Sequence, residues 1–494
     1  MSSRTSRVLA VAGVLAVGIV ALALGGVFSA SAATGSTTTA ATTTTSSSAT
    51  GTTTTTSPST TTTGSGSVNP NDKNLYPFGY PQGGPAVNTP PPPGEPTLSP
   101  VYATKTTTRL YGTNPFEEAV SVTQHIWPAV VPLNDPTENN NVPDRPWGVT
   151  LVTPDDPLTA ITATPLIHFP DDAPLLYVTS HGIPDITLNE LKRLGDTGIS
   201  RYNNVDAFLV GAAANSAVEN QLTSIGMKYV TVTGSDAPTL ADNVDKLYGS
   251  IQNPDTGVPS MPGYNTVIGS MDGNDWQYVL PATHWVAHMP TGLLWVHRGS
   301  VPQPTIDALK RRGAMGNIYL FGGPDQISSA VAKQLSQYGR IVRVTNDDPV
   351  AFNTPPTDSP EATAIAFAKM YDPMGMFGWK ITGPGHGFTL VNVNDWQAAV
   401  ASAPLSHLGF HAPLLLTDSA TSLPSALDGY FTSVSPFFLN SPADGPYNMT
   451  YVIGSWDQIS WTEQARVDYV SEMHNRRVVG SDTGSTYADS QPGA

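Results

Sequence analysis

Two short clusters of basic residues are the first candidates for binding a negatively charged ligand. Lys192 and Arg193 form one cluster, and Lys310, Arg311 and Arg312 form the other. Each cluster ends a stretch with helical periodicity. Ammonium and guanidinium groups bind carboxylates and phosphates. Positive charge in the last turn of a helix also stabilises that helix, by about 0.3–1 kcal/mol per residue. The clusters therefore have both a polymer-binding and a purely structural interpretation.

Two tryptophans form a second candidate site, which suits a carbohydrate. Trp276 and Trp396 each stand in an Asp-Trp-Gln triplet at the predicted start of a helix. An exposed indole offers a flat apolar face and one N–H donor, and both fit the ring of a sugar. Free N–H groups at a helix start also attract phosphate or carboxylate. Ordinary packing of the two indoles between repeats is the alternative.

The spacing of the histidines raises the question of a metal site. His284 and His288 are four residues apart, as are His407 and His411. On a helix this spacing places two imidazoles on one face, where they can hold zinc. Neither pair has a glutamate after its first histidine, so the metalloprotease motif is absent. His168 matches His407 in position, which favours a shared structural role. We expect no metal site and no cofactor.

The motifs of common hydrolases and nucleotide-binding enzymes are incomplete. Asp-Thr-Gly triplets begin at Asp196, Asp255 and Asp482. An aspartic protease needs two such triplets facing each other at the ends of hydrophobic strands, and these stand in polar segments. The chain has no cysteine, no Gly-x-Ser-x-Gly turn and no complete phosphate-binding glycine motif. We expect no catalytic residues, and therefore no enzyme.

One stretch of the chain shows which elements carry these residues. Phe388–Val393 is an apolar run with β-branched residues, and Asn394-Asp395 forms a turn with a helix N-cap. Ala398–His407 has apolar positions at helical spacing, and Ala412–Thr417 is a second apolar run. Two buried strands joined by one helix make a βαβ unit. Such units build parallel sheets.

The same pattern occurs at two earlier places, residues 149–179 and 266–296. The period is about 120 residues, which is too long for a solenoid repeat and suits small domains. The sequence therefore predicts three α/β modules with parallel sheets. Their predicted bounds are 101–236, 237–348 and 349–482.

Several short motifs follow one another in a fixed order along these modules. They are Arg109-Leu110-Tyr111-Gly112, Ile318-Tyr319-Leu320-Phe321-Gly322-Gly323, Ala403-Pro404-Leu405-Ser406 and Ala412-Pro413-Leu414-Leu415-Leu416-Thr417. In these motifs the chain resembles the cell-wall-binding repeat type 2 family of Gram-positive surface proteins. They correspond to the family's opening, its glycine-ending strand, the end of its small-residue helix and its Leu-Leu-Thr strand. The resemblance covers residues 105–482.

The resemblance implies three tandem Rossmann-like modules in a pseudo-threefold arrangement. It also implies non-covalent binding to the cell wall through an anionic secondary polymer. The chain departs from the family at two places. The second arginine of the family's opening is replaced by Pro115 in the first copy and by Ala237 in the second. The aspartate that begins the family's small-residue helix is replaced by Thr159, Tyr278 and Ala398 in the three copies. The chain is thus similar to a divergent member.

The two ends of the chain have compositions unlike the modules. Residues 1–32 carry Arg4 and Arg7 before an apolar run and a small-residue cleavage site, which is typical of a signal peptide. The run is also long enough for a retained membrane anchor. Residues 33–100 are rich in Thr and Ser and then in Pro, so we predict a disordered stalk. We expect the same of the tail, 483–494.

Net charge narrows the possible partners. The formal charge is −16, which argues against a nucleic-acid ligand and against broad attraction to anionic polymers. We expect a secreted, non-catalytic protein of the cell wall or cell surface, without stable membrane insertion after signal cleavage. Its expected partner is an anionic wall polymer or a peptidoglycan-associated glycan. One alternative is self-association, as a surface-layer or adhesion protein. A wall hydrolase such as an amidase is a further alternative.

Overall fold

The structure is a computed structural model, and all its described residues lie within 65–494, one of two compact units of the chain. The described residues are 98–130, 144–168, 171–195, 198–252, 265–313, 316–344, 359–408, 411–437, 446–473, 478–479 and 486–487. The predicted signal peptide and the stalk up to residue 97 lie outside them. No described helix has both the length and the apolar composition needed to cross a bilayer.

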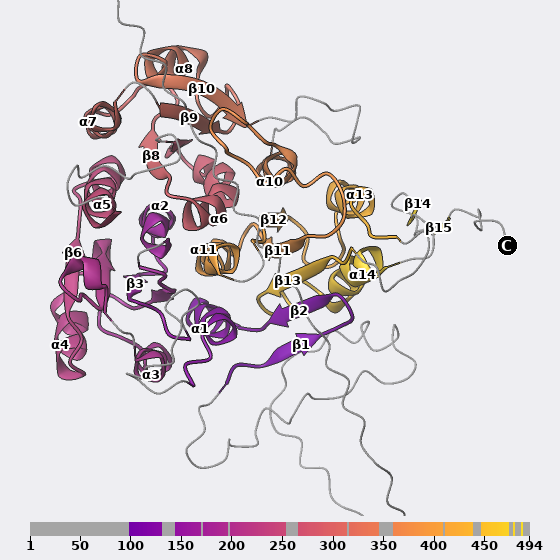
Figure 1. Cartoon of the computed structure of the whole chain (residues 1–494), viewed down its shortest axis with the longest axis horizontal. Helices are drawn as coiled ribbons and strands as arrows, with labels where there is room; N and C mark the ends of the chain where they lie inside the picture. Colours follow the sequence, from indigo (N-terminus) through magenta and orange to yellow (C-terminus); the bar gives the residue numbers. More distant parts are fainter. Residues whose placement is uncertain are drawn as a thin grey trace, which may run out of the picture. The chain divides into compact units, whose positions relative to one another are not determined.

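The first sheet contains four parallel strands in the order β4-β3-β5-β6. Figure 1 labels two of them, β3 and β6. Its strands are β3 (Val149–Val152), β4 (Leu175–Tyr177), β5 (Ala207–Val210) and β6 (Tyr229–Val232). The helical segments between these strands are α2 (Pro157–Thr162), η2 (Thr164–Ile167), α3 (Asp185–Leu194), η3 (Ser200–Tyr202), η4 (Gly211–Ala213) and α4 (Ser216–Ser224). All residues of β3, β4 and β5 are buried, because helices cover both faces of a parallel sheet.

The second sheet repeats this order as β8-β7-β9-β10, again all parallel. Its strands are β7 (Thr266–Ser270), β8 (Gly292–Val296), β9 (Gly316–Phe321) and β10 (Gly339–Val344). Its helical segments are α5 (Ala237–Gln252), η5 (Asp275–Val279), α6 (Leu280–His288), α7 (Gln303–Arg312) and α8 (Ser329–Leu335).

The third sheet has the order β12-β11-β13-β2-β1, and only β1 runs antiparallel to its neighbour. Its strands are β1 (Val101–Ala103), β2 (Thr107–Leu110), β11 (Gly387–Asn392), β12 (Leu414–Thr417) and β13 (Met449–Ile453). Its helices are α10 (Pro360–Lys369), α11 (Trp396–Ala401), α12 (Pro404–His407), α13 (Ser425–Ser433) and α14 (Trp461–Ser471). The predicted α/β class is confirmed: three sheets alternate with helices, and two of these sheets are entirely parallel.

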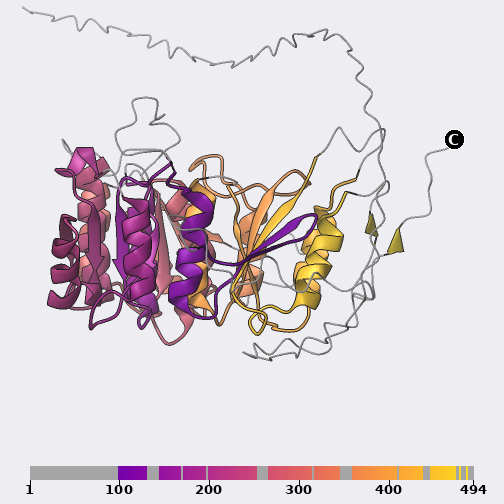
Figure 2. The ribbon, with the colours of Figure 1, turned by 90° about the horizontal axis from the view of Figure 1, so that it is seen from below.

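The N-terminal strands complete the sheet of the last module. β2 pairs with β13 in the place that β6 and β10 take in the other sheets, and Figure 2 shows the indigo β1–β2 segment beside the yellow strand. Helix α1 (Pro115–Ile126) follows β2 and packs on β4 and α3 of the first sheet. The strands of the segment predicted as one module, 101–236, are therefore shared between two sheets.

Two predicted elements differ from the structure in detail. The helix predicted over Ala398–His407 is divided into α11 and α12. Pro404 begins the second piece and cannot donate a backbone hydrogen bond to the turn before it. In the tail predicted to be disordered, Thr486–Tyr487 (β15) pairs antiparallel with Val478–Val479 (β14).

The arginine of the opening motif serves the fold. Arg109 is fully buried in β2 and donates to the carbonyl oxygens of Gly454 at 2.9 Å and Ile459 at 2.7 Å, in the turn between β13 and α14. Arg343 in β10 donates to the matching carbonyls of Gly322 and Ile327. These arginines fix the turn that follows the glycine-ending strand.

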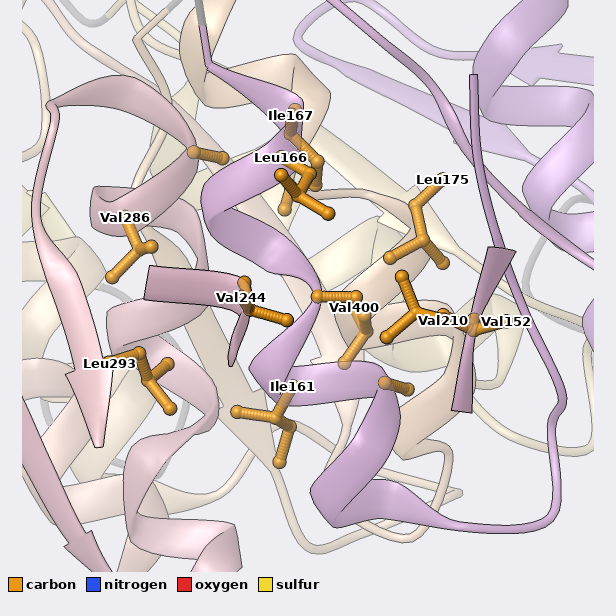
Figure 3. Close-up of a cluster of buried hydrophobic side chains, with 14 of the residues drawn as sticks. Val152, Ile161, Leu166, Ile167, Leu175, Val210, Val244, Val286, Leu293 and Val400 are labelled. Carbon is orange, nitrogen blue, oxygen red and sulfur yellow. The ribbon is translucent and has the colours of Figure 1, made fainter. Parts of the chain in front are cut away.

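The three modules share one hydrophobic core. The matching helices α2–η2, α6 and α11–α12 touch one another pairwise. Figure 3 shows Ile161 and Leu166 from the first module, Val286 from the second and Val400 from the third within one cluster. This contact between equivalent helices agrees with the expected pseudo-threefold arrangement.

Candidate functional site

The two candidate tryptophans lie against each other where the second and third modules meet. The rings of Trp276 and Trp396 are 6.2 Å apart between centroids and 75° apart in plane, an edge-to-face contact. Trp276 lies in η5 and Trp396 is the first residue of α11, and both side chains are partly exposed. In the first module Pro157 takes the matching position. Each of these segments follows the carboxyl end of a central strand, the general ligand-binding edge of parallel sheets.

An aspartate and a glutamine hold the start of α11 in place. Asp395 caps α11 by accepting from the backbone N–H of Ala398 at 3.3 Å. Gln397 donates from Nε2 to the carbonyl oxygen of Pro154 at 3.1 Å, and its own carbonyl accepts from the hydroxyl of Tyr177 at 2.8 Å. Residues of the first module therefore fix the position of Trp396 in the third.

A buried pair of carboxyl groups lies beside Trp396. Gln458 donates from Nε2 to Oε1 of Glu118 at 3.1 Å and to the carboxylate of Asp395. Glu118, on α1, is fully buried, and its Oε2 has no hydrogen-bond partner among the described residues. Burial, and then the charge of Asp395, raise the pKa of Glu118 well above its usual range. Burial raises the pKa of Asp395 to about 6.

The first basic cluster lies in the last turn of α3. Arg193 binds Glu190 through Nε at 2.8 Å and Nη2 at 2.6 Å, and its Nη1 donates to the carbonyl oxygen of Pro128 at 2.8 Å. The arginine therefore ties α3 to the end of α1. Lys192 beside it is exposed.

The second basic cluster lies in the last turn of α7 and faces α5. Arg311 forms ion pairs with Asp242 at 2.8 Å and Asp245 at 2.7 Å, and the buried Arg312 forms an ion pair with Asp245. Lys310 is exposed. The contacts of both arginines thus support the structural interpretation, while polymer binding through the two clusters stays a prediction.

The basic clusters and the tryptophans lie at opposite edges of the sheets. Arg312 reaches the carbonyl oxygen of Asn265, just before β7, and its guanidinium covers Gly292 at the start of β8. These positions mark the amino edge, whereas Trp276 and Trp396 follow strands at the carboxyl edge. The two candidate groups therefore do not form one site.

The histidines of each four-residue pair point in different directions. His284 is fully buried between α6 and α11–α12, where Nδ1 lies 2.6 Å from Oγ of Ser406 and Nε2 lies 3.2 Å from the carbonyl oxygen of Ala399. Burial lowers the pKa of His284 to about 4. His288 instead faces His411. No three metal-binding side chains in the described ranges are placed to hold an ion together.

Sequence reasoning found the tryptophans but missed the carboxyl pair. Matching Asp-Trp-Gln triplets identified Trp276 and Trp396, whereas their contact depends on how the modules pack. The only sequence feature that could have indicated burial of Glu118 is its position on the apolar face of a helix. Its partners Asp395 and Gln458 are distant in sequence. The aspartates of the three Asp-Thr-Gly triplets lie outside the described residues.

Comparison with known proteins shows that this chain shares its fold with two solved structures. No protein-family model matches the chain, and no curated protein sequence matches it. Cwp6 from Clostridium difficile matches with a TM-score of 0.54 and 18% identity, over 76% of this chain and 51% of that one. Cwp8 from the same organism matches with a TM-score of 0.52 and 15% identity, over 74% and 52%. This chain thus spans about half the length of each of those structures.

Proposed function

We propose that the protein is a non-catalytic cell-surface protein that binds a wall glycan through Trp276 and Trp396. The contact between these partly exposed indoles, at the carboxyl edge of two sheets, carries the proposal. Wall association is supported by the fold shared with two cell wall proteins of Clostridium difficile and by the motifs of the wall-binding repeat family.

The charges near the tryptophans bear on the kind of polymer. Asp395 caps the helix that Trp396 begins, and the carboxylate of Asp275 directly precedes Trp276. Both groups, and the net charge of −16, oppose an anionic ligand. We therefore propose that sugar rings bind by stacking and hydrogen bonding. We propose that the exposed Lys192 and Lys310, at the opposite edge of the sheets, contact anionic groups of the same polymer.

Co-sedimentation with purified Gram-positive cell walls tests this proposal. Replacing both tryptophans by alanine should weaken binding by about tenfold or more, which corresponds to about 1.4 kcal/mol of lost contact energy. Tyr447→Ala is the matched control, because Tyr447 is an exposed aromatic residue that belongs neither to the tryptophan pair nor to the exposed turn after α10. Acid extraction of the secondary polymers should abolish binding of the unchanged protein. Equal binding of wild type and the double variant would refute a role of the tryptophans.

Self-association is a second candidate function. Tyr371, Met374 and Met376 are 42%, 75% and 47% exposed within one turn after α10. Adjacent exposed apolar side chains favour contact with another protein surface. Sedimentation velocity over a concentration series should then show assembly that Met374→Asp reduces. We propose no catalysis, and release of dye from labelled peptidoglycan would contradict that.

A further inference from the structure

Two histidines from different modules meet at the end of the central helices. His288 is the last residue of α6, and His411 lies just before β12, 123 residues later. Their Nδ1 atoms are 3.2 Å apart, and their ring centroids are 4.6 Å apart. The two imidazoles thus bring the same kind of ring nitrogen within 3.2 Å of each other.

This separation suits two ligands of one metal ion. At zinc–nitrogen distances of about 2.0–2.1 Å, two ligands of a tetrahedral ion lie about 3.3 Å apart. A direct hydrogen bond gives a similar distance, but it needs a proton on one nitrogen and a bare lone pair on the other. The two explanations make different predictions when metal is added.

Aromatic neighbours hold the ring of His288 in position. The ring of His288 stacks on Trp379 at 5.3 Å and 18°, and it meets Trp285 edge-on at 5.7 Å. His411 has a φ of 50°, a costly backbone conformation for a residue other than glycine. Its side chain is exposed, so solvent reaches the pair.

A third histidine lies close by but is bound elsewhere. His407 Nε2 lies 2.5 Å from the carboxylate of Asp172, and its ring is 4.9 Å from that of His168. Water is therefore the source of the remaining ligands for an ion held by His288 and His411.

We propose that His288 and His411 form a two-histidine site for a divalent transition-metal ion, and that the ion links the second and third modules. Imidazole nitrogen suits zinc, nickel and copper, whereas calcium and magnesium require oxygen ligands. The site uses one histidine from each pair that the sequence places four residues apart. It is independent of the proposed wall binding.

Calorimetric titration of the metal-stripped full chain with zinc chloride tests this site. The wild type should bind one zinc ion saturably. His288→Gln and His411→Gln should each weaken binding by at least about tenfold. His181→Gln is the matched control, because His181 is an exposed histidine of the first module whose Nδ1 contacts only Ser180 in the hydrogen bonds described. Magnesium chloride should give no binding heat.

Titration with copper, followed by tryptophan fluorescence, reports whether the ion binds at His288. A paramagnetic ion bound at His288 should quench the fluorescence of the stacked Trp379. Trp379→Phe should therefore keep the zinc affinity and reduce the saturable quenching, and the part that remains is expected from Trp285, whose ring also contacts His288. Equal zinc affinity in the wild type and His411→Gln would overturn the proposal. The exposed position of His411 makes that variant decisive even if His288→Gln fails to fold.

Discussion

At the scale of single residues, burial and charge conflict at Glu118, which is fully buried in α1. A buried carboxyl with a raised pKa keeps its proton in the folded protein at a pH where the unfolded chain has lost it. The folded state then binds more protons, so the free energy of unfolding falls as the pH rises above the ordinary value of 4.5. The neighbouring Asp395, with a pKa of about 6, acts in the same direction.

Glu118→Gln should remove the part of this pH dependence that Glu118 contributes. The amide retains an acceptor for Gln458 and adds a donor toward Asp395. The variant should gain up to about 1.4 kcal/mol of stability over wild type for each pH unit above the ordinary pKa. Urea unfolding at pH 5 and pH 8 measures the gain, and Glu117→Gln, at the partly exposed neighbour, is the control. A gain that does not grow with pH would contradict this explanation.

His284 should make the free energy of unfolding change with pH in the opposite direction, so that it falls as the pH is lowered. Its pKa of about 4 lies below the ordinary value of 6.5, so the unfolded chain binds the proton first as the pH falls. Wild type should lose up to about 1.4 kcal/mol per pH unit between 6.5 and about 4, relative to His284→Gln. Denaturant unfolding of both proteins across this range measures the difference. A constant difference would show that His284 is not held neutral.

The residues that sequence reasoning placed correctly are those whose role is local. The cap at Asp395 and the helix starts at Trp276 and Trp396 follow from neighbouring residues. The partners of Arg311 could not be predicted in the same way, because Asp242 and Asp245 lie in another helix. A basic cluster alone does not show whether its counter-charge lies in the protein or in a ligand.

At the scale of elements, the opening motif that contains Arg109 was recognised from the sequence, but neither the strand β2 nor its pairing partner was predicted. Apolar patterning indicates which residues form a strand, and the periodic repeats indicate which strands share a module. β2 pairs with β13, about 340 residues later, and no local signal marks that pairing. The buried Arg109 is the residue that joins these two strands at their carboxyl ends.

Arg109→Ala should destabilise the fold more than Arg343→Ala. Arg109 is fully buried and also donates from Nε to Oε1 of Gln464 at 2.8 Å, whereas Arg343 is partly exposed. Leaving the buried carbonyls without donors should cost about 3 kcal/mol or more for Arg109. Guanidinium chloride unfolding of both variants gives the comparison. Equal losses would mean that the two matching arginines contribute alike despite their different burial.

At the scale of the whole molecule, the three modules depend on one another. The chain has no cysteine, so no disulfide holds the modules together. Their equivalent helices share one core, and the first strands of the chain complete the last sheet. The family resemblance predicted the pseudo-threefold packing, but it did not predict that β1 and β2 complete the sheet of the last module.

Deleting residues 1–112 should therefore disrupt more than the N-terminal segment. The deletion removes β1, β2 and Arg109, and it exposes β13 as an unpaired edge beside the shared core. We expect one cooperative thermal transition in a chain that begins at residue 98, and loss of that transition in a chain that begins at residue 113. The two chains differ only by the closing strands and the turn after them. Separate transitions in the longer chain, with only one of them lost in the shorter chain, would instead show that the modules fold independently.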